Sequence, residues 1–393
     1  MSRLTYQEAM ALSPLLPTTP GGNARFMSRR AAWLPGSDLH EELDNLKKQG
    51  IVFPPHTAAF GGHVYAQAAH AVCETLGSTI SKSNLGLHTI HGYFTAAGRP
   101  DRPYVYEVAI VTRGRSFVTA RVEARQPLRA SSQAKPGAVF MPGDCIFTED
   151  DVQSGDDGSG RHSDDIGTNL GVVCFTALVS FVKARPHSFG ADCQEAPVQQ
   201  RFASILQSRP PSQWSPSPPV DIEVMLNVVE RRDIVGTFPM VDMKKVDAMA
   251  AYNEGRPLYE KRDLILYRLL GPSTGMTAND HVLAHAYAAD RNGLLMATNH
   301  LEFPLNDKTA TLSNSFVVHT NVDDAVMAYA DFAASDNDVG GWWIQEVCFA
   351  RAAAGRAIIQ NKIWSPAGVH VATEYQDGLC IAQEGDGGIK VKL

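Results

Sequence analysis

The sequence contains little that points to secretion, to a membrane or to nucleic acid. It has six cysteines among 393 residues, none in Cys-x-x-Cys spacing and most of them in apolar runs. Such cysteines are typical of reduced, buried thiols in an intracellular protein. No basic segment followed by an apolar core opens the chain, and no apolar run approaches the roughly 20 residues that span a bilayer. The formal charge is −7, without a basic stripe interleaved with aromatics, so nucleic acid is a poor candidate partner.

Length and apolar content instead predict a globular protein with two domains. A chain of 393 residues is longer than one core usually organises, and 44% hydrophobic residues are enough to bury two cores. Residues 185–219 are rich in Pro, Ser and Gln, which is typical of an interdomain linker with polyproline character. We therefore predict an N-terminal extension over 1–58, one domain over 59–184 and a second domain over 220–393.

Acidic residues gather inside the first predicted domain, in an insertion over about 127–169. Few basic residues accompany them, and no Glu closes a twelve-residue calcium-loop pattern. A solvated, mobile loop is therefore a better interpretation of this segment than a calcium site.

Each predicted domain combines one helical pattern with several strand patterns. In the first half, small residues recur with helical spacing after Gly61 and Gly62, and residues 115–124 alternate between apolar and polar. In the second half, a helical pattern over 279–295 precedes a strand pattern over 309–319. A helix followed by antiparallel strands, occurring twice, predicts two α+β units in which a sheet wraps a helix.

Four motifs follow one another in the first half. They are Phe60-Gly-Gly-His-Val-Tyr-Ala-Gln-Ala68, Leu87-His-Thr-Ile-His-Gly-Tyr-Phe94, Arg102-Pro-Tyr-Val-Tyr-Glu-Val108 and Arg113-Gly-Arg-Ser-Phe117. With these motifs in this order, the chain resembles the type II acyl-CoA thioesterases, or TesB-like family, from about Phe60 to Gly378. The resemblance implies two hotdog domains in tandem, each an antiparallel sheet wrapped around a long helix.

The resemblance also carries the family's catalytic residues onto Asp290, Thr311 and Gln376. A carboxylate, a hydroxyl and an amide around one water can orient the water and accept its proton during attack on a thioester, without a covalent intermediate. The family has His where this chain has Asn314, which cannot titrate near neutral pH. Without the resemblance, the better interpretation would be that Asp290 pairs with Arg291 and that Thr311 and Gln376 are ordinary strand residues.

Further residues are candidates for contacts to the substrate. A helix N-terminus opened by Gly61 and Gly62 would offer backbone N–H groups to the oxyanion of the reaction. His63 and His91, in the same group of motifs, are candidates for substrate binding. The implied substrate is an acyl-CoA, and we expect no metal and no redox cofactor, because CoA enters only as part of the substrate.

The first half does not repeat the polar set of the second. By eye, its positions equivalent to Thr311 and Gln376 are Leu87 and Ser180. We therefore expect one active site per chain, carried by the second predicted domain.

Three short patterns suggest other chemistry, and each is incomplete. Gly271-Pro-Ser-Thr-Gly275 fits the Gly-x-Ser-x-Gly elbow of serine hydrolases, but the first half lacks the strand–helix alternation of a parallel sheet. His281 and His285 have the spacing of a zinc helix, yet a valine stands where zinc peptidases need Glu. His88 and His91 lie three apart in a strand pattern and are expected on opposite faces, which excludes shared metal ligation.

Two alternatives to acyl-CoA hydrolysis remain. One is a hotdog reaction on a carrier-bound acyl or polyketide thioester, and the other is non-catalytic binding of an acyl thioester, which Asn314 keeps open. The resemblance implies an intracellular role in fatty acid metabolism and is compatible with a homo-oligomer. Val391-Lys-Leu393 matches the peroxisomal Ser-Lys-Leu signal at two of three positions, but its bulky valine favours the cytoplasm, with the peroxisome second.

Overall fold

The structure is a computed structural model that describes most of the chain. The described residues are 3–36, 44–45, 47–48, 58–132, 139–141, 170–216, 238–291, 293–301, 308–327 and 341–381. Most of the predicted acidic insertion and the three C-terminal residues lie outside the described residues.

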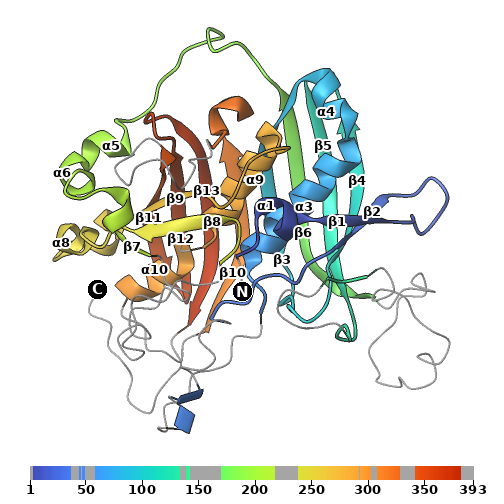
Figure 1. The fold of residues 1–393 in the computed structure, drawn as a ribbon, viewed down its shortest axis with the longest axis horizontal. Helices are drawn as coiled ribbons and strands as arrows, with labels where there is room; N and C mark the ends of the chain where they lie inside the picture. Colours follow the sequence, from blue (N-terminus) through green and yellow to red (C-terminus); the bar gives the residue numbers. More distant parts are fainter. Residues whose placement is uncertain are drawn as a thin grey trace.

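The described strands form one antiparallel sheet (Figure 1). The first half contains β1 (Leu12–Leu15), β2 (Ala24–Ser28), β3 (Leu85–Phe94), β4 (Val105–Arg113), β5 (Phe117–Pro127) and β6 (Leu170–Lys183). The second contains β7 (Ser215–Pro216), β8 (Val241–Lys245), β9 (Arg262–Leu269), β10 (Lys308–Val318), β11 (Trp343–Ala353), β12 (Arg356–Trp364) and β13 (His370–Ile381). Their order in the sheet is β1-β2-β4-β5-β6-β3-β10-β13-β12-β11-β9-β8-β7.

Two long helices pack against the inner face of this sheet and against each other, α3 (Gly61–Leu76) and α9 (Ala278–Ala289). The shorter α-helices are α1 (Tyr6–Met10), α4 (Ser78–Ser83), α5 (Val198–Arg201), α6 (Ala203–Leu206), α8 (Met249–Asn253) and α10 (Gly293–His300). Single 3₁₀ turns lie at η3 (Pro211–Gln213), η4 (Leu258–Glu260) and η5 (Val322–Ala325). No helix among the described residues is long and apolar enough to cross a membrane.

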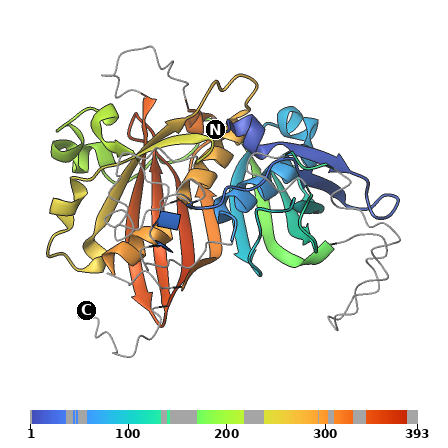
Figure 2. The same cartoon turned by 60° about the horizontal axis from the view of Figure 1, so that its bottom comes forward.

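The two halves repeat one topology in mirror order. In the first half, α3 follows β2 and the strand order is β2-β4-β5-β6-β3; in the second, α9 follows β9 and the order is β9-β11-β12-β13-β10. The two orders meet at the β3–β10 pair, and Figure 2 shows the strands of the two halves side by side. The predicted fold class, α+β with two hotdog units in tandem, is confirmed.

Small residues allow the two long helices to lie close to the sheet and to each other. Ala66, Ala68 and Ala69 of α3 are fully buried, as are most residues of α9. The N-terminus of α9 is fixed by a capping box, in which the Thr277 hydroxyl accepts from the Asp280 N–H and the Asp280 carboxylate accepts from the Thr277 N–H. This cap sets where the helix begins, and the helix ends twelve residues later at Asp290.

Tyr65 of α3 joins the two halves where β3 and β10 pair. Its hydroxyl donates to the Ile90 carbonyl of β3 at 2.7 Å and accepts from the Phe316 N–H of β10 at 2.9 Å. Ile90 and Phe316 are register partners in that antiparallel pair. The helix of the first half therefore fixes the position of the first strand of the second helix–strand unit.

The predicted N-terminal extension packs on the fold and pairs with its sheet. Its strand β2 pairs with β4, and Tyr6 of α1 is buried and donates to the Asp280 carboxylate at 2.9 Å. The Leu4 carbonyl accepts from the Met240 N–H at 2.8 Å. The N-terminal segment thus contacts both halves.

Part of the predicted linker is helical, so the expected polyproline character is wrong for α5 and α6. Val198 and Phe202 are four residues apart and both buried, with Trp214, in a second apolar cluster against the sheet of the second half. Arg201 between them forms an ion pair with the buried Glu346 at 2.6 Å. The helical spacing of the buried apolar residues outweighed the high Pro and Ser content. The boundaries of the domains stay predictions.

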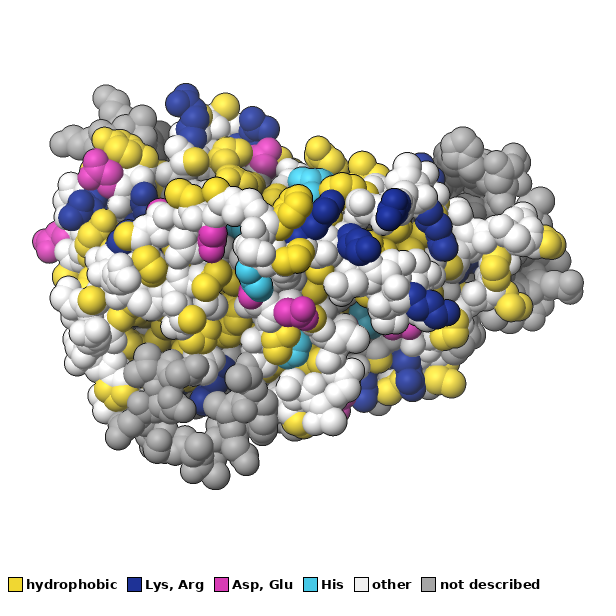
Figure 3. All heavy atoms as spheres, turned by 90° about the horizontal axis from the view of Figure 1, so that it is seen from above, with side chains coloured by type: hydrophobic (Ala, Val, Ile, Leu, Met, Phe, Trp, Pro, Cys, Tyr) yellow, Lys and Arg dark blue, Asp and Glu magenta, His cyan; other side chains and the backbone are white. Residues whose placement is uncertain are grey.

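Charged and apolar side chains are mixed across the face seen in Figure 3, where Lys and Arg are most frequent over the first half. Scattered apolar side chains are ordinary on a water-facing surface.

Candidate active site

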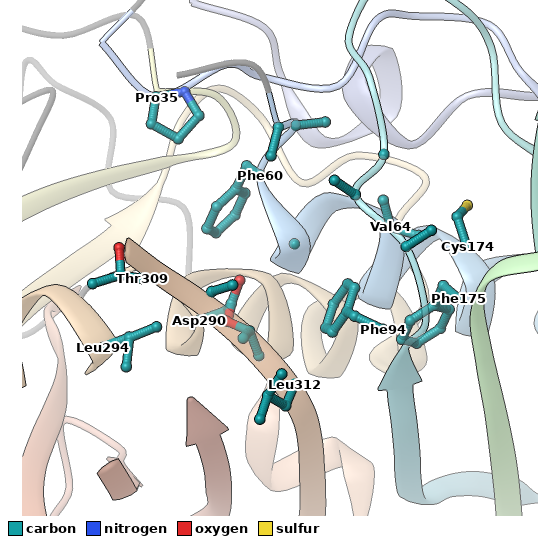
Figure 4. Close-up of a pocket in the computed structure, with 18 of the residues that line it drawn as sticks. Pro35, Phe60, Val64, Phe94, Cys174, Phe175, Asp290, Leu294, Thr309 and Leu312 are labelled. Carbon is teal, nitrogen blue, oxygen red and sulfur yellow. The ribbon is translucent and has the colours of Figure 1, made fainter. Parts of the chain in front are cut away.

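A cavity of about 340 Å³ lies where the N-terminus of α3 meets the C-terminus of α9 (Figure 4). Both halves supply its walls. Most of its larger lining side chains are apolar or aromatic, namely Trp33, Phe60, Val64, Phe94, Tyr104, Phe175, Leu294 and Leu312. Asp290, Thr311 and Gln376 line the same cavity, so the structure brings the three sequence-predicted residues together.

One oxygen of the Asp290 carboxylate is the centre of this group. Oδ1 accepts from Gln376 Nε2 at 2.6 Å, from Asn314 Nδ2 at 3.0 Å and from Thr311 Oγ1 at 3.4 Å. Gln376 Nε2 also donates to Thr311 Oγ1 at 2.9 Å. The carboxylate, the hydroxyl and the amide therefore form one connected network, to which Asn314 adds a fourth member.

A β-bulge explains how Thr311 and Asn314 both reach Asp290. Residues three apart in a regular strand point to opposite faces of a sheet. The pairing of β10 with β13 shifts register between Thr311 and Ser313, and the extra residue turns Thr311 to the same face as Asn314. Asn314 is the register partner of Gln376, which places their two amides next to each other.

Two helix ends meet at Asp290 and have opposite electrostatic effects on it. The residue caps the C-terminus of α9, where the helix dipole disfavours a negative charge. It also faces the N-terminus of α3, where the Gly62 N–H donates to the carboxylate. A Cβ on Gly61 would come within 3.1 Å of Asp290 Oδ2, so glycine there lets the carboxylate approach the helix end.

Burial raises the pKa of Asp290 from its usual range to about 6, against the opposing effect of hydrogen bonds from Asn314, Gly62, Thr311 and Gln376. A carboxylate with a pKa near the working pH is ionised in most molecules and still basic enough to take a proton. The alternative from the sequence is a pairing of Asp290 with Arg291. The Arg291 guanidinium lies 5.0 Å from the ring centroids of Trp33 and Phe238, and the Asp290 carboxylate is held by neutral donors.

The two histidines predicted to bind substrate do not lie in the cavity wall. His63 is buried among apolar side chains of the core, and burial lowers the pKa of its imidazole to about 4. His91 is exposed on the outer face of β3, with Nδ1 3.0 Å from the Ser315 hydroxyl. Gly61 lines the cavity and Gly62 donates to Asp290, so of these four candidates only the glycines reach the site.

A second bulge corrects the expectation that His88 and His91 lie on opposite faces. The pairing of β3 with β6 shifts register between Leu87 and Thr89. His88 Nδ1 and Thr89 Oγ1 consequently both contact the Ser180 hydroxyl, at 3.1 and 2.7 Å, on the outer face that also carries His91. No group of three metal-ligating side chains occurs among the described residues.

The histidine pair with zinc-helix spacing and the Gly271–Gly275 elbow pattern are structural. His285 Nδ1 lies 2.7 Å from the Tyr267 hydroxyl and its Nε2 lies 2.8 Å from the Ala325 carbonyl, so both nitrogens serve the core. His281 Nδ1 accepts from the Met327 N–H at 3.2 Å. Ser273 lies in a loop between β9 and α9, beside an antiparallel sheet that cannot form a hydrolase elbow.

The matched bulges also locate the equivalent positions of the first half. Thr311 corresponds to Leu87, as expected, because each precedes the bulge of its strand. Gln376 pairs with Asn314, and the residue in the corresponding pairing of the first half is Val179, which pairs with Ile90. The proposed equivalence of Ser180 with Gln376 is thus off by one residue, and Ser180 points outward. The first half still lacks the polar set.

Sequence reasoning missed the residues behind the carboxylate. Glu374, Asn361 and Gln345 are buried and polar on the inner face of the second half. The alternation of β13 offered a signal for one of them, because Glu374 lies two residues before Gln376 and shares its face.

Comparisons with known proteins agree with this architecture. Residues 52–139 match the model of the acyl-CoA thioesterase N-terminal domain. No curated protein matches the sequence. The solved structure of acyl-CoA thioesterase II TesB2 from Mycobacterium marinum is 19% identical, with 96% of this chain and 98% of that chain covered and a TM-score of 0.53. The tesB protein of Mycobacterium avium subs paratuberculosis is 15% identical, with 96% and 98% covered and a TM-score of 0.51.

The first half of the molecule therefore contains the segment that is similar to the acyl-CoA thioesterase N-terminal domain, and the described part of the chain has the double hotdog fold of these solved structures. The resemblance to TesB-like acyl-CoA thioesterases that the motifs indicated is confirmed.

Proposed function

We propose that this protein hydrolyses acyl thioesters, in the first place acyl-CoA, to a free acid and a thiol. The observation that supports this proposal is the Asp290 carboxylate, whose pKa is raised to about 6 and which joins Thr311 and Gln376 in the wall of a largely apolar cavity. The acyl chain would occupy that cavity, against lining side chains such as Phe94 and Phe175.

The chemistry needs one water beside Asp290. As the water oxygen attacks the thioester carbonyl carbon, Asp290 takes the water proton. The tetrahedral intermediate then breaks its C–S bond, and the departing thiolate takes the proton back from Asp290. Holding the water against both the base and the substrate supplies much of the rate, because the reaction no longer waits for a chance encounter.

Thr311, Gln376 and Asn314 have supporting roles. Gln376 donates to the Thr311 oxygen, which leaves the hydroxyl hydrogen free to turn toward Asp290 or the water. Asn314 stands where the family has His, and it supplies a donor to Asp290 at 3.0 Å without titrating. The role of Asn314 at this place is therefore to position the Asp290 carboxylate.

The developing oxyanion requires donors, and the N-terminus of α3 is the candidate source. The Gly62 N–H donates to Asp290, so the role falls to the Gly61 N–H and to the dipole of this sixteen-residue helix. The absence of a side chain at Gly61 lets Asp290 and Phe94 lie close to this helix end.

The test is release of free thiol from a panel of acyl-CoAs of graded chain length, with the wild type and Asp290→Asn side by side. We expect steady release by the wild type and a rate about 10²- to 10⁴-fold lower in Asp290→Asn. Acyl-CoA binding without turnover by either protein would favour a binding function, and turnover of carrier-bound thioesters alone would favour the carrier alternative.

A further inference from the structure

A second carboxyl group is buried behind Asp290. Glu374 lies on the inner face of β13, two residues before Gln376, and is fully buried. Its Oε2 accepts from Asn361 Nδ2 at 2.6 Å. Its Oε1 has no hydrogen-bond partner among the described residues. Buried carboxyl groups are rare unless they are paired, so this residue needs an explanation.

Asn361 connects Glu374 to the peptide that precedes Asp290. The same Nδ2 lies 3.2 Å from the carbonyl of Ala289, the last residue of α9. Gln345 Nε2 donates to that carbonyl as well, at 2.9 Å. Two amide side chains from β11 and β12 thereby hold the end of the helix that carries the catalytic carboxylate, and Glu374 holds one of them.

The network continues toward Gln376 across Gly293. A Cβ built on Gly293 would lie 2.6 Å from Gln376 Oε1 and 3.0 Å from Asn361 Nδ2. Both side chains therefore border the same small space, which only a glycine leaves open. Glu374, Asn361 and Gln376 are thus parts of one buried polar layer beneath Asp290.

We propose that Glu374 is a positioning residue for Asp290: through Asn361 it fixes the end of α9, and it stays protonated, so that the single negative charge of the two carboxyl groups rests on Asp290. The proposal rests on the proposed function for its link to catalysis. Its protonation state can be measured without any substrate.

The hydrogen-bond donors decide which carboxyl group carries the charge. Asp290 receives three side-chain donors and the Gly62 N–H at a helix N-terminus, whereas Glu374 receives one amide. Burial raises the pKa of Glu374 well above its usual range, ionised Asp290 raises it further, and the Asn361 hydrogen bond opposes both. Two ionised carboxylates in one dry layer would repel each other.

The other groups that face Glu374 in the described part of the chain are neutral. Tyr65 of α3 is close enough that an ionised Glu374 would raise the pKa of its hydroxyl, and that hydroxyl is held between two backbone groups of β3 and β10. The register partners of Glu374 are Asn361 on β12 and Phe316 on β10. A protonated Glu374 also supplies a donor to a layer in which the carbonyl oxygens of Asn361, Gln345 and Gln376 have no donor among the described residues.

The test compares Glu374→Gln with Glu374→Ala, and uses Tyr375→Phe, an outward-facing neighbour on β13, as the matched control. Glu374→Gln imitates the protonated acid, so kcat should stay within about twofold and the acidic limb of the pH profile should not move. Glu374→Ala removes the partner of Asn361, so kcat per folded molecule should fall about 10- to 100-fold with little change in KM. Infrared difference spectra at pH 8 should show a protonated carboxyl band in the wild type that Glu374→Gln lacks.

Three outcomes would overturn the proposal. They are the absence of that infrared band, an acidic limb that moves to lower pH in Glu374→Gln, and a Glu374→Ala that is less stable but turns over at the wild-type rate. If Glu374→Ala does not fold, Asn361→Leu breaks the same link from β12 and should show the same loss of kcat. A wild type without any thioesterase activity would refute the proposed function alone, because the infrared band reports on Glu374 in the resting protein.

Discussion

The two halves of the molecule have the same backbone topology but differ in the side chains on the inner face of the sheet. When the strand registers of the two halves are matched, polar residues of the second half are equivalent to apolar residues of the first. Thr311, Asn314, Glu374, Gln376 and Asn361 correspond in turn to Leu87, Ile90, Ala177, Val179 and Val122. All five residues of the first half are buried. The hotdog backbone therefore accepts either a packed apolar layer or a polar layer without a change of topology.

The opposite end of the α3–α9 pair shows what the first half has in place of a catalytic site. There Asn279, at the N-terminus of α9, accepts from the Leu87 N–H at 2.7 Å. A single amide thus accepts from the bulged strand of the first half, whereas Asp290 with its four donors lies beside the bulged strand of the second. Each side chain of the polar layer makes at least one hydrogen bond, because a buried polar side chain without any is costly.

The largest effect is expected from Asp290→Asn, which removes the charge from the polar layer and keeps its volume. General-base assistance is typically worth about 10²- to 10⁴-fold, so kcat should fall by that order. Folding stability should hold or rise, because a costly buried charge is lost. Thiol release and the thermal midpoint, measured on one preparation, check the expected loss of kcat and the expected stability. An active but destabilised variant would show that Asp290 is structural.

A pH dependence follows from the raised pKa of Asp290. Activity should fall about tenfold per pH unit below about pH 6, where the base becomes protonated. The folded state binds this proton more tightly than the unfolded chain does. The contribution of Asp290 to the free energy of unfolding should therefore decrease as pH rises from about 4 to about 6, and this decrease should vanish in Asp290→Asn. Denaturant titrations of both proteins across that window are the measurement.

Gly293→Ala disturbs the polar layer without changing any of its members. The new methyl group would meet Gln376 Oε1 at 2.6 Å and push that amide away from Asp290, so kcat should fall about tenfold. Alanine suits the helix α10, so the helix itself should not be weakened. In a Gln376→Ala background the substitution should cost less, because only the 3.0 Å approach to Asn361 Nδ2 remains, and an equal loss in both backgrounds would place its effect elsewhere.

Val179→Gln brings the amide of the second half into the equivalent position of the first. The new side chain would be buried among apolar neighbours, so stability should fall by about 1–3 kcal/mol while turnover per folded molecule is retained. Gln376→Val, the reverse exchange, should reduce turnover. Denaturant melts and thiol-release assays of Val179→Gln and Gln376→Val are the measurements. An equal loss of activity in the two variants would contradict the proposed difference between the halves.

The smallest effect is expected from Ser273→Ala. Its loop lies beside an antiparallel sheet and outside the cavity wall, so thiol release should stay within about twofold of the wild type. A loss of several orders of magnitude would restore the serine hydrolase interpretation of Gly271 to Gly275.

The sequence predicted the fold because its signal occurs twice, with a small-residue helix before alternating strands in each half. It predicted the meeting of Asp290, Thr311 and Gln376 through motif resemblance and not through spacing. The missed features depend on register. The bulges after Thr311 and Leu87 move side chains between the two faces of the sheet, and nothing in the local composition marks them. The position of His91 on the outer face follows from the same strand geometry.

The β3–β10 seam has a consequence for the order of synthesis. Residues 85–94 leave the ribosome more than two hundred residues before their partner strand at 308–318. Until then, the first half exposes a long strand edge, which is a template for unwanted pairing between nascent chains. The Gly62 N–H and the Asp290 carboxylate come from opposite sides of the same seam, so an incomplete chain cannot assemble the proposed active site. The strand β10 then covers the exposed edge, and β13, which follows it in the chain, completes the site with Gln376.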